Sequence, residues 1–211
     1  MRYKAIIFDM DGVLFETEEF YYHRRATFLT SKGISIRHID PAFFVGGRAS
    51  QIWPEILGSD IDQWNVPALE KEYEDYKTKH GAPYGELVFP DAKVVLSVLK
   101  EKGLRLALAS NTDRGEVERA LQEAGIYEFF DAIFSATECH ACKPDPEVYE
   151  KAWAYLGQSK EETLVVEDSE KGIAAGVAAG LTVWAIRDTK WQVNQSQADK
   201  LIEGLSDLLK E

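Results

Sequence analysis

Short apolar runs alternate with segments of helical spacing along most of this chain, and this order limits the folds it can adopt. Apolar runs with the length of buried strands occupy residues 5–8, 104–109, 132–134, 164–166 and 182–186. Helical spacing occurs between them at residues 92–102, 115–124, 146–156 and 171–179. Strands that alternate with helices in this way form a parallel sheet covered by helices on both faces. We therefore predict an α/β protein with a Rossmann-like parallel-sheet core.

One long segment interrupts the alternation. Between residues 15 and 85 we find no parallel strand, and the helical spacing there falls at residues 16–32, 49–57 and 66–80. The segment directly follows the first strand, and active sites in such sheets lie beyond the carboxyl ends of the strands. We predict an α-helical cap domain at residues 15–85, inserted into a core domain formed by residues 1–14 and 86–211.

Composition limits the partners and the compartment. Hydrophobic residues make up 45% of the 211 residues, which is enough for a substantial core. The net charge of −12 argues against a nucleic-acid or anionic-membrane partner but permits a small anionic substrate. Two cysteines give no disulfide framework, residues 1–4 carry no signal-peptide pattern, and no apolar run could span a bilayer. We expect a cytoplasmic protein and, because a capped site needs no partner subunit, a monomer.

Two carboxylates stand two residues apart at the end of the first predicted strand, in Phe8-Asp9-Met10-Asp11-Gly12-Val13. Gly12 favours a turn directly after the strand. One of these carboxylates could act as a nucleophile and the other could move a proton. The sequence therefore predicts a catalytic pair, Asp9 and Asp11, at the edge of the sheet.

Polar residues follow three later strands. They are Ser110-Asn111-Thr112, Lys143-Pro144-Asp145-Pro146 and Glu167-Asp168-Ser169. A helix start after Ser110, with Asp113 and Glu116 at capping-box spacing, suits a phosphate. A lysine on a proline-stiffened turn could neutralise a phosphate, and adjacent buried acids call for a cation such as Mg²⁺. Taken singly, these features could also be a turn with a helix cap, a surface lysine and an acidic loop.

Together, these motifs resemble the haloacid dehalogenase superfamily, in the subgroup that has a helical cap after the first motif. The resemblance covers nearly the whole chain, and the motifs occur in the order typical of the family. The matching segments are Asp9-Met10-Asp11-Gly12-Val13, Ser110-Asn111-Thr112, Lys143-Pro144-Asp145-Pro146, and Glu167-Asp168-Ser169 with Gly172 and Gly180 after it.

The resemblance implies a phosphatase that works through an aspartyl-phosphate. Asp9 would be the nucleophile, and Asp11 would protonate the leaving alkoxide and then take a proton from water. Ser110 and the Asn111 backbone would hold phosphate oxygens, and Lys143 would offset the negative charge. The expected substrate is a small-molecule phosphate ester.

The resemblance also implies a Mg²⁺ cofactor. Its ligands would be Asp9, the Asp11 backbone carbonyl and Asp168, with Glu167 nearby or bound through water. The electrostatic reason is general, because a carboxylate approaches a phosphate dianion only where cations screen the repulsion.

Three other functions compete with the phosphatase. A phosphomutase that resembles β-phosphoglucomutase would share all four motifs. Its pattern has a histidine shortly after the first motif, where this chain has Tyr21 with His23 two positions on. It also has a Ser-Arg pair in the cap turn, where this chain reads Gly47-Arg48-Ala49-Ser50. Cleavage of a carbon–halogen bond releases no alkoxide that needs a proton, so the presence of Asp11 argues against a carbon–halogen hydrolase. A non-catalytic binding module would lack a nucleophile or a metal ligand, and none is missing.

Two further features have open interpretations. Arg48, in the turn Val45-Gly46-Gly47-Arg48, is a candidate for substrate specificity because it could reach an anionic or polar tail, or it could be an ordinary surface arginine. Cys139 and Cys142 form a C-x-x-C pair just before Lys143, without a second cysteine pair or matching histidine spacing for a zinc site. Oxidation of this pair could still disturb the neighbouring lysine.

Overall fold

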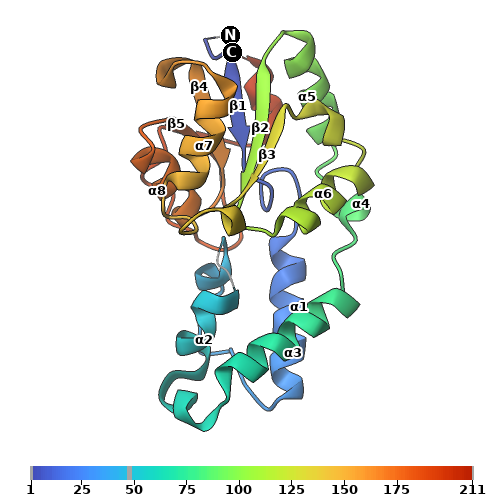
Figure 1. Cartoon of the computed structure of the whole chain (residues 1–211), viewed down its shortest axis with the longest axis vertical. Coiled ribbons are helices and arrows are strands. Elements are labelled where there is room, and N and C mark those ends of the chain that lie inside the picture. Colours follow the sequence, from blue (N-terminus) through green and yellow to red (C-terminus); the bar gives the residue numbers. More distant parts are fainter. Residues whose placement is uncertain (1, 47–48, 211) are drawn as a thin grey trace.

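The computed structural model describes residues 2–46 and 49–210. Its centre is a parallel sheet with strands in the order β3-β2-β1-β4-β5-β6 (Figure 1). The strands are β1 (Ala5–Phe8), β2 (Arg105–Ser110), β3 (Ala132–Ser135), β4 (Thr163–Glu167), β5 (Thr182–Ile186) and β6 (Lys200–Ile202). β1 pairs with β2 on one side and with β4 on the other. The predicted α/β fold is confirmed. From β1 the chain adds β2 and β3 on one side and then β4, β5 and β6 on the other, and ligands bind where the strand order switches sides in this way.

Helices cover both faces of the sheet. They are α5 (Ala92–Glu101) and α6 (Arg114–Glu123) on one face, and α7 (Glu147–Leu156) and α8 (Glu170–Ala178) on the other. Successive side chains of a strand point to opposite faces. Accordingly, Ile6 and Phe8 pack in the apolar cluster under α5 and α6, whereas Ala5 and Ile7 pack in the cluster under α7 and α8.

A group of helices lies at one end of the sheet, apart from the covering layers (Figure 1). Its members are α1 (Glu18–Ser31), α2 (Ala49–Leu57) and α3 (Val66–Lys79). They share a separate apolar cluster that includes Phe28, Leu69 and Tyr73. The inserted helical cap of the predicted fold class is therefore present, while the domain boundaries at residues 14/15 and 85/86 stay a prediction.

Short elements are the part of the fold that the spacing did not predict. The edge strand β6 has three residues, and α4 (Tyr84–Leu87) has one turn, so neither shows a periodicity. Short 3₁₀ helices of one or two turns occupy Pro41–Phe44, Gly58–Gln63, Tyr127–Phe129, Ala136–Glu138, Lys160–Glu162 and Leu205–Lys210.

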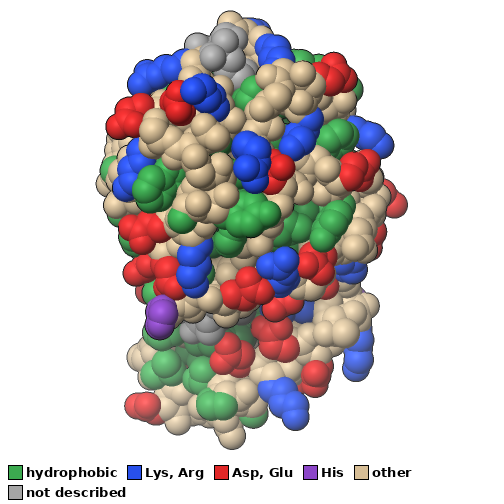
Figure 2. Space-filling model, turned by 45° about the horizontal axis from the view of Figure 1, so that its top comes forward, with side chains coloured by type: hydrophobic (Ala, Val, Ile, Leu, Met, Phe, Trp, Pro, Cys, Tyr) green, Lys and Arg blue, Asp and Glu red, His purple; other side chains and the backbone are tan. Residues whose placement is uncertain are grey.

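Charges of both signs are mixed on the surface. On the face drawn in Figure 2, Asp and Glu side chains are interspersed with Lys and Arg. Within residues 2–46 and 49–210, none of the helices combines the length and the apolar character that a membrane span requires.

Candidate active site

The polar motifs meet at the carboxyl ends of the central strands. Asp9 directly follows β1, Ser110 is the last residue of β2, and Glu167 is the last residue of β4. The register of the sheet places Phe8 beside Leu108 on β2 and Val166 on β4. Because parallel strands end at the same edge, these residues from distant parts of the chain become neighbours.

Lys143 lies at the centre of this group and is 2% exposed. Its Nζ donates to Asp9 Oδ1 at 2.6 Å and to Glu167 Oε1 at 2.7 Å. It also donates to Tyr149 Oη at 2.7 Å and to the Ala109 carbonyl oxygen at 2.9 Å. Burial disfavours the ammonium, but the Asp9 and Glu167 carboxylates outweigh burial and raise the pKa of Lys143. The lysine is therefore a fixed cation between two carboxylates.

Glu167 is fully buried, and hydrogen bonds engage both of its oxygens. Oε1 accepts from Lys143 and from Tyr149 Oη at 2.6 Å. Oε2 accepts from the Asp168 N–H at 2.9 Å, the Ser169 N–H at 3.2 Å and Ser169 Oγ at 3.1 Å. Burial alone would raise the pKa of Glu167, but the Lys143 charge and these hydrogen bonds hold it below the ordinary value. Glu167 therefore stays ionised and anchors the loop that carries Asp168.

The turn after β1 presents Asp11 between two threonines. Thr17 Oγ1 donates to Asp11 Oδ1 at 2.6 Å, and Thr112 Oγ1 donates to Asp11 Oδ2 at 2.7 Å. Burial raises the pKa of Asp11, and the hydrogen bond from Thr17 opposes the rise. Gly12 has φ +77°, and a Cβ there would lie 1.9 Å from Asp168 Oδ2, so this turn requires glycine.

An acidic cluster lies beside the nucleophile position. Oxygens of Asp9, Glu167 and Asp168 lie within 4.8 Å of one another. Asp168 Oδ1 is buried and has no hydrogen-bond partner among the described residues. Burial, followed by the charge of Glu167, raises the pKa of Asp168 well above its ordinary value. A buried carboxylate oxygen without a partner is unfavourable unless a cation binds it, so this donor set fits a divalent metal ion.

Ser110 and Asn111 line the same cavity as Asp9, Asp11 and Lys143. Ser110 Oγ accepts the Thr112 N–H at 3.0 Å. Asn111 Oδ1 accepts the Lys143 N–H at 3.0 Å, and its Nδ2 donates to the Gly46 carbonyl at 3.1 Å. The Asn111 side chain therefore links the Lys143 loop to the cap, a contact that the sequence did not predict.

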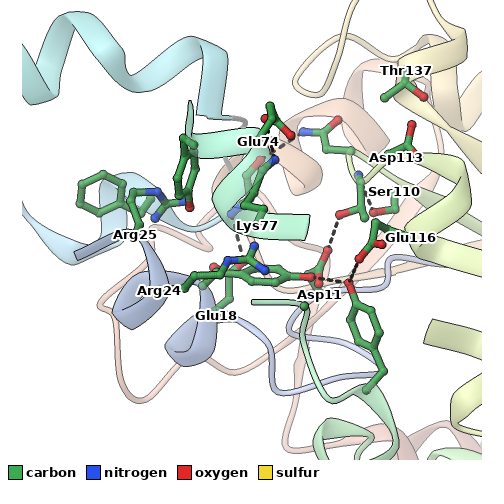
Figure 3. A pocket seen from close by; sticks show the side chains of 18 of the residues that line it. Asp11, Glu18, Arg24, Arg25, Glu74, Lys77, Ser110, Asp113, Glu116 and Thr137 are labelled. Carbon is green, nitrogen blue, oxygen red and sulfur yellow. Dashed lines mark hydrogen bonds and ion pairs between the residues drawn. The ribbon is translucent and has the colours of Figure 1, made fainter. Parts of the chain in front are cut away.

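The cavity continues from these residues into the cap, with a volume of about 880 Å³. Figure 3 shows Asp11 and Ser110 facing side chains of α1 and α3, including Glu18, Arg25 and Lys77. Burial, followed by the charge of Asp11, raises the pKa of Glu18 to about 8. Arg48 lies outside the described residues, so its place at the substrate stays a prediction.

Several residues of the site had no signal in the sequence. Thr17 and Glu18 begin the cap, and Tyr149 lies inside α7, with no motif to single them out. Thr112 belongs to a predicted motif, but its bond to Asp11 joins residues 101 positions apart. Such contacts depend on how distant segments meet, which local spacing does not encode.

The C-x-x-C pair lies outside the acidic cluster. Cys139 and Cys142 are both thiols in the structure. Cys139 Sγ donates to the Ser135 carbonyl at 3.8 Å, and burial raises the pKa of this thiol. A raised pKa lowers the fraction of reactive thiolate.

Comparison with known proteins agrees with the fold and the motifs. The profile of the family described as haloacid dehalogenase-like hydrolase matches residues 6–186, and the chain belongs to this family. It is 30% identical to the pyrophosphatase PpaX of Halalkalibacterium halodurans, over 99% of this chain and 96% of that protein.

Two other proteins show the range of these similarities. The chain is 34% identical to the chloroplastic protein SUPPRESSOR OF QUENCHING 1 of Arabidopsis thaliana, over 89% of this chain but only 18% of that protein. The crystal structure of β-phosphoglucomutase from Clostridium difficile superimposes with a TM-score of 0.81, covering 98% of this chain and 93% of that one. At 22% identity, that structure supports the fold alone.

Proposed function

We propose that this protein is a Mg²⁺-dependent phosphatase that hydrolyses a small phosphomonoester through an aspartyl-phosphate on Asp9. The observation that carries the proposal is the arrangement around Asp9. One oxygen lies 2.6 Å from the buried Lys143 ammonium. The acidic cluster lies beside it, with an Asp168 Oδ1 that has no hydrogen-bond partner in the described part of the chain. The family relationship and the similarity to a pyrophosphatase support phosphoryl chemistry.

In the first step, an Asp9 carboxylate oxygen attacks phosphorus and the ester oxygen leaves. Asp11 gives its proton to that oxygen, so a neutral alcohol departs. The raised pKa of Asp11 favours a carboxyl that still holds a proton when substrate binds. Thr17 and Thr112 fix the direction in which the proton is presented.

In the second step, water attacks phosphorus of the aspartyl-phosphate, and Asp11, now ionised, takes its proton. Inorganic phosphate leaves and Asp9 returns to a carboxylate. Ser110, the Asn111 backbone and Lys143 bind the phosphoryl oxygens in both steps, and the Lys143 cation stabilises the charge that develops on them.

The metal would be held by Asp9, Asp168 and the Asp11 backbone carbonyl. Because its oxygens already accept hydrogen bonds, Glu167 acts indirectly, by fixing Lys143 and the Asp168 loop. When bound, Mg²⁺ supplies positive charge that screens the repulsion between Asp9 and the phosphate dianion.

The test is phosphate release from a panel of phosphomonoesters with Mg²⁺, measured for wild type and Asp9→Asn. We expect release by wild type, with a loss of at least about a thousandfold in the variant because its amide is not a nucleophile. Chelation should abolish release and added Mg²⁺ should restore it. Activity of Asp9→Asn near wild type would refute the nucleophile assignment, and full activity after chelation would refute the metal.

The alternative is a β-phosphoglucomutase-like phosphomutase. At the position where that pattern has a histidine, Tyr21 Oη lies 2.9 Å from Tyr84 Oη, so its hydroxyl is already hydrogen-bonded. This arrangement favours the phosphatase. Isomerisation of β-glucose 1-phosphate, without release of phosphate from any ester, would favour the mutase instead.

A further inference from the structure

A buried arginine in the cap has donors without acceptors among the residues that the structure describes. Arg25 lies on α1, about two turns after Glu18, and is 6% exposed. Among the described residues, neither its Nε nor its Nη1 has a hydrogen-bond partner. Its guanidinium carbon lies 4.7 Å from the centroid of the Phe44 ring. Burying a guanidinium without acceptors is unfavourable, which indicates that a bound ligand supplies them.

Arg25 lines the same cavity as Asp9 and Lys143. Figure 3 places Arg25 and Ser110 on opposite sides of this cavity. A ligand whose phosphate is bound at Ser110 and Lys143 would therefore bring its other end, not its phosphate, towards Arg25.

The other cations that line the cavity have partners in the described part of the protein. Lys77 Nζ lies 2.7 Å from Glu74, and Arg119 Nη2 lies 2.8 Å from Glu116. The Arg24 Nε also has no partner within the residues that the structure describes, but the Arg24 Nη1 donates to the His80 carbonyl at 3.1 Å. Arg24 is also less deeply buried than Arg25.

Glu18 does not bond to Arg25. Its Oε1 accepts the Gly46 N–H at 3.2 Å, and the Arg25 charge acts on Glu18 only at a distance, with no hydrogen bond or ion pair between the two side chains in the described structure. The guanidinium therefore keeps both its charge and its donors for a molecule in the cavity.

We infer that Arg25 binds a second oxyanion of the substrate, a carboxylate or second phosphate at the end remote from the cleaved ester. This inference rests on the proposed phosphatase function and narrows its substrate class. A guanidinium presents paired N–H groups that match the two oxygens of an oxyanion. A substrate with a neutral tail would leave these donors unpaired, so the site should discriminate against it.

The experiment compares esters that differ in the charge of the tail. One pair is 6-phosphogluconate and glucitol 6-phosphate, two open-chain esters that differ in a carboxylate at C1. A second set is fructose 1,6-bisphosphate with fructose 1-phosphate and fructose 6-phosphate, which differ in a second phosphate. For wild type, we expect kcat/KM to be at least about tenfold higher for the doubly anionic member of one or both sets.

Two variants assign this preference to Arg25. In Arg25→Met the preference should fall to nearly one, because kcat/KM for the doubly anionic esters falls towards that for the neutral-tailed esters. Arg25→Lys keeps the charge but not the paired donors, so it should retain part of the preference. Arg37→Met removes an exposed cap arginine and should leave the preference unchanged.

Each outcome decides the assignment. A preference confined to the gluconate pair identifies a carboxylate, and one confined to the bisphosphate set identifies a second phosphate. Equal kcat/KM across both sets in wild type overturns the assignment even if the variants do not fold, as does a preference that survives in folded Arg25→Met. Absence of phosphate release from every ester would instead overturn the proposed function itself, and the assignment with it.

Discussion

At the scale of single residues, the site depends on a few buried polar groups that satisfy one another. Tyr149 Oη accepts from Lys143 and donates to Glu167, so one hydroxyl connects the buried cation to the acid. Local sequence predicted that Lys143 and Glu167 carry chemistry, because the lysine stands on a proline-stiffened turn and adjacent acids at the end of a buried strand are costly without a cation. It did not predict Tyr149, because an aromatic residue on a helix face is ordinary core.

Glu18 provides a pH-dependent test at this scale. Its pKa is about 8 in the folded protein and near 4.5 in an unfolded chain, mainly because of burial. Folding therefore retains a proton that the unfolded chain releases, and stability falls as pH rises from about 4.5 to 8. In metal-free protein, Glu18→Gln should become more stable relative to wild type across this range, by about 1 to 3 kcal/mol above pH 8.

The measurement is the free energy of unfolding in denaturant at a series of pH values, with chelator present. Glu19→Gln is the matched control, because its exposed neighbour Lys190 lowers the pKa of Glu19. The control should therefore show no gain with rising pH. A difference between Glu18→Gln and wild type that is independent of pH would contradict the assigned shift.

At the scale of elements, α8 packs directly on the end of β4. A Cβ on Gly172 would lie 1.7 Å from Glu167 Oε1, so the first turn of α8 has no room for a side chain there. We expect Gly172→Ala to displace Glu167 and to lower the free energy of unfolding by about 2 to 4 kcal/mol. Activity should fall with it, because Glu167 positions Lys143.

Chemical denaturation and phosphate release measured on the same samples check this prediction. Gly85→Ala is the control, since a Cβ there would meet a backbone oxygen at an ordinary 3.5 Å and α4 gains a better helix former. Equal stability of Gly172→Ala and wild type would show that the helix can shift, contrary to the packing described.

The strands and longer helices were predictable because burial sets the spacing of their apolar residues, and this spacing repeats along the whole element. The capping box predicted for α6 forms only in part. Asp113 Oδ1 accepts the Gly115 N–H at 2.9 Å, but the Glu116 carboxylate accepts from Arg119 instead. A nearby guanidinium competes for the glutamate, and local spacing does not reveal such a neighbour.

At the scale of the whole molecule, the candidate site combines contacts among the strand-end motifs of the core with contacts between the core and the cap. The sequence was enough to predict that the strand-end motifs lie close together, because a parallel sheet places the carboxyl ends of all its strands at one edge. The positions of the cap residues Thr17, Glu18 and Arg25 in the site could not be predicted, because they depend on how α1 approaches that edge. The Asn111 bond to the Gly46 carbonyl joins the two parts across 65 positions of sequence.

The central claim is that the phosphoryl group passes through Asp9. The most direct measurement is acid quenching of wild type during turnover of a good ester substrate with Mg²⁺, followed by peptide mapping by mass spectrometry. The account predicts one phosphoryl group on the peptide that contains Asp9, released by hydroxylamine and absent from Asp9→Asn. Turnover with no phosphopeptide at any quench time, or a phosphoryl group on another residue, would contradict it.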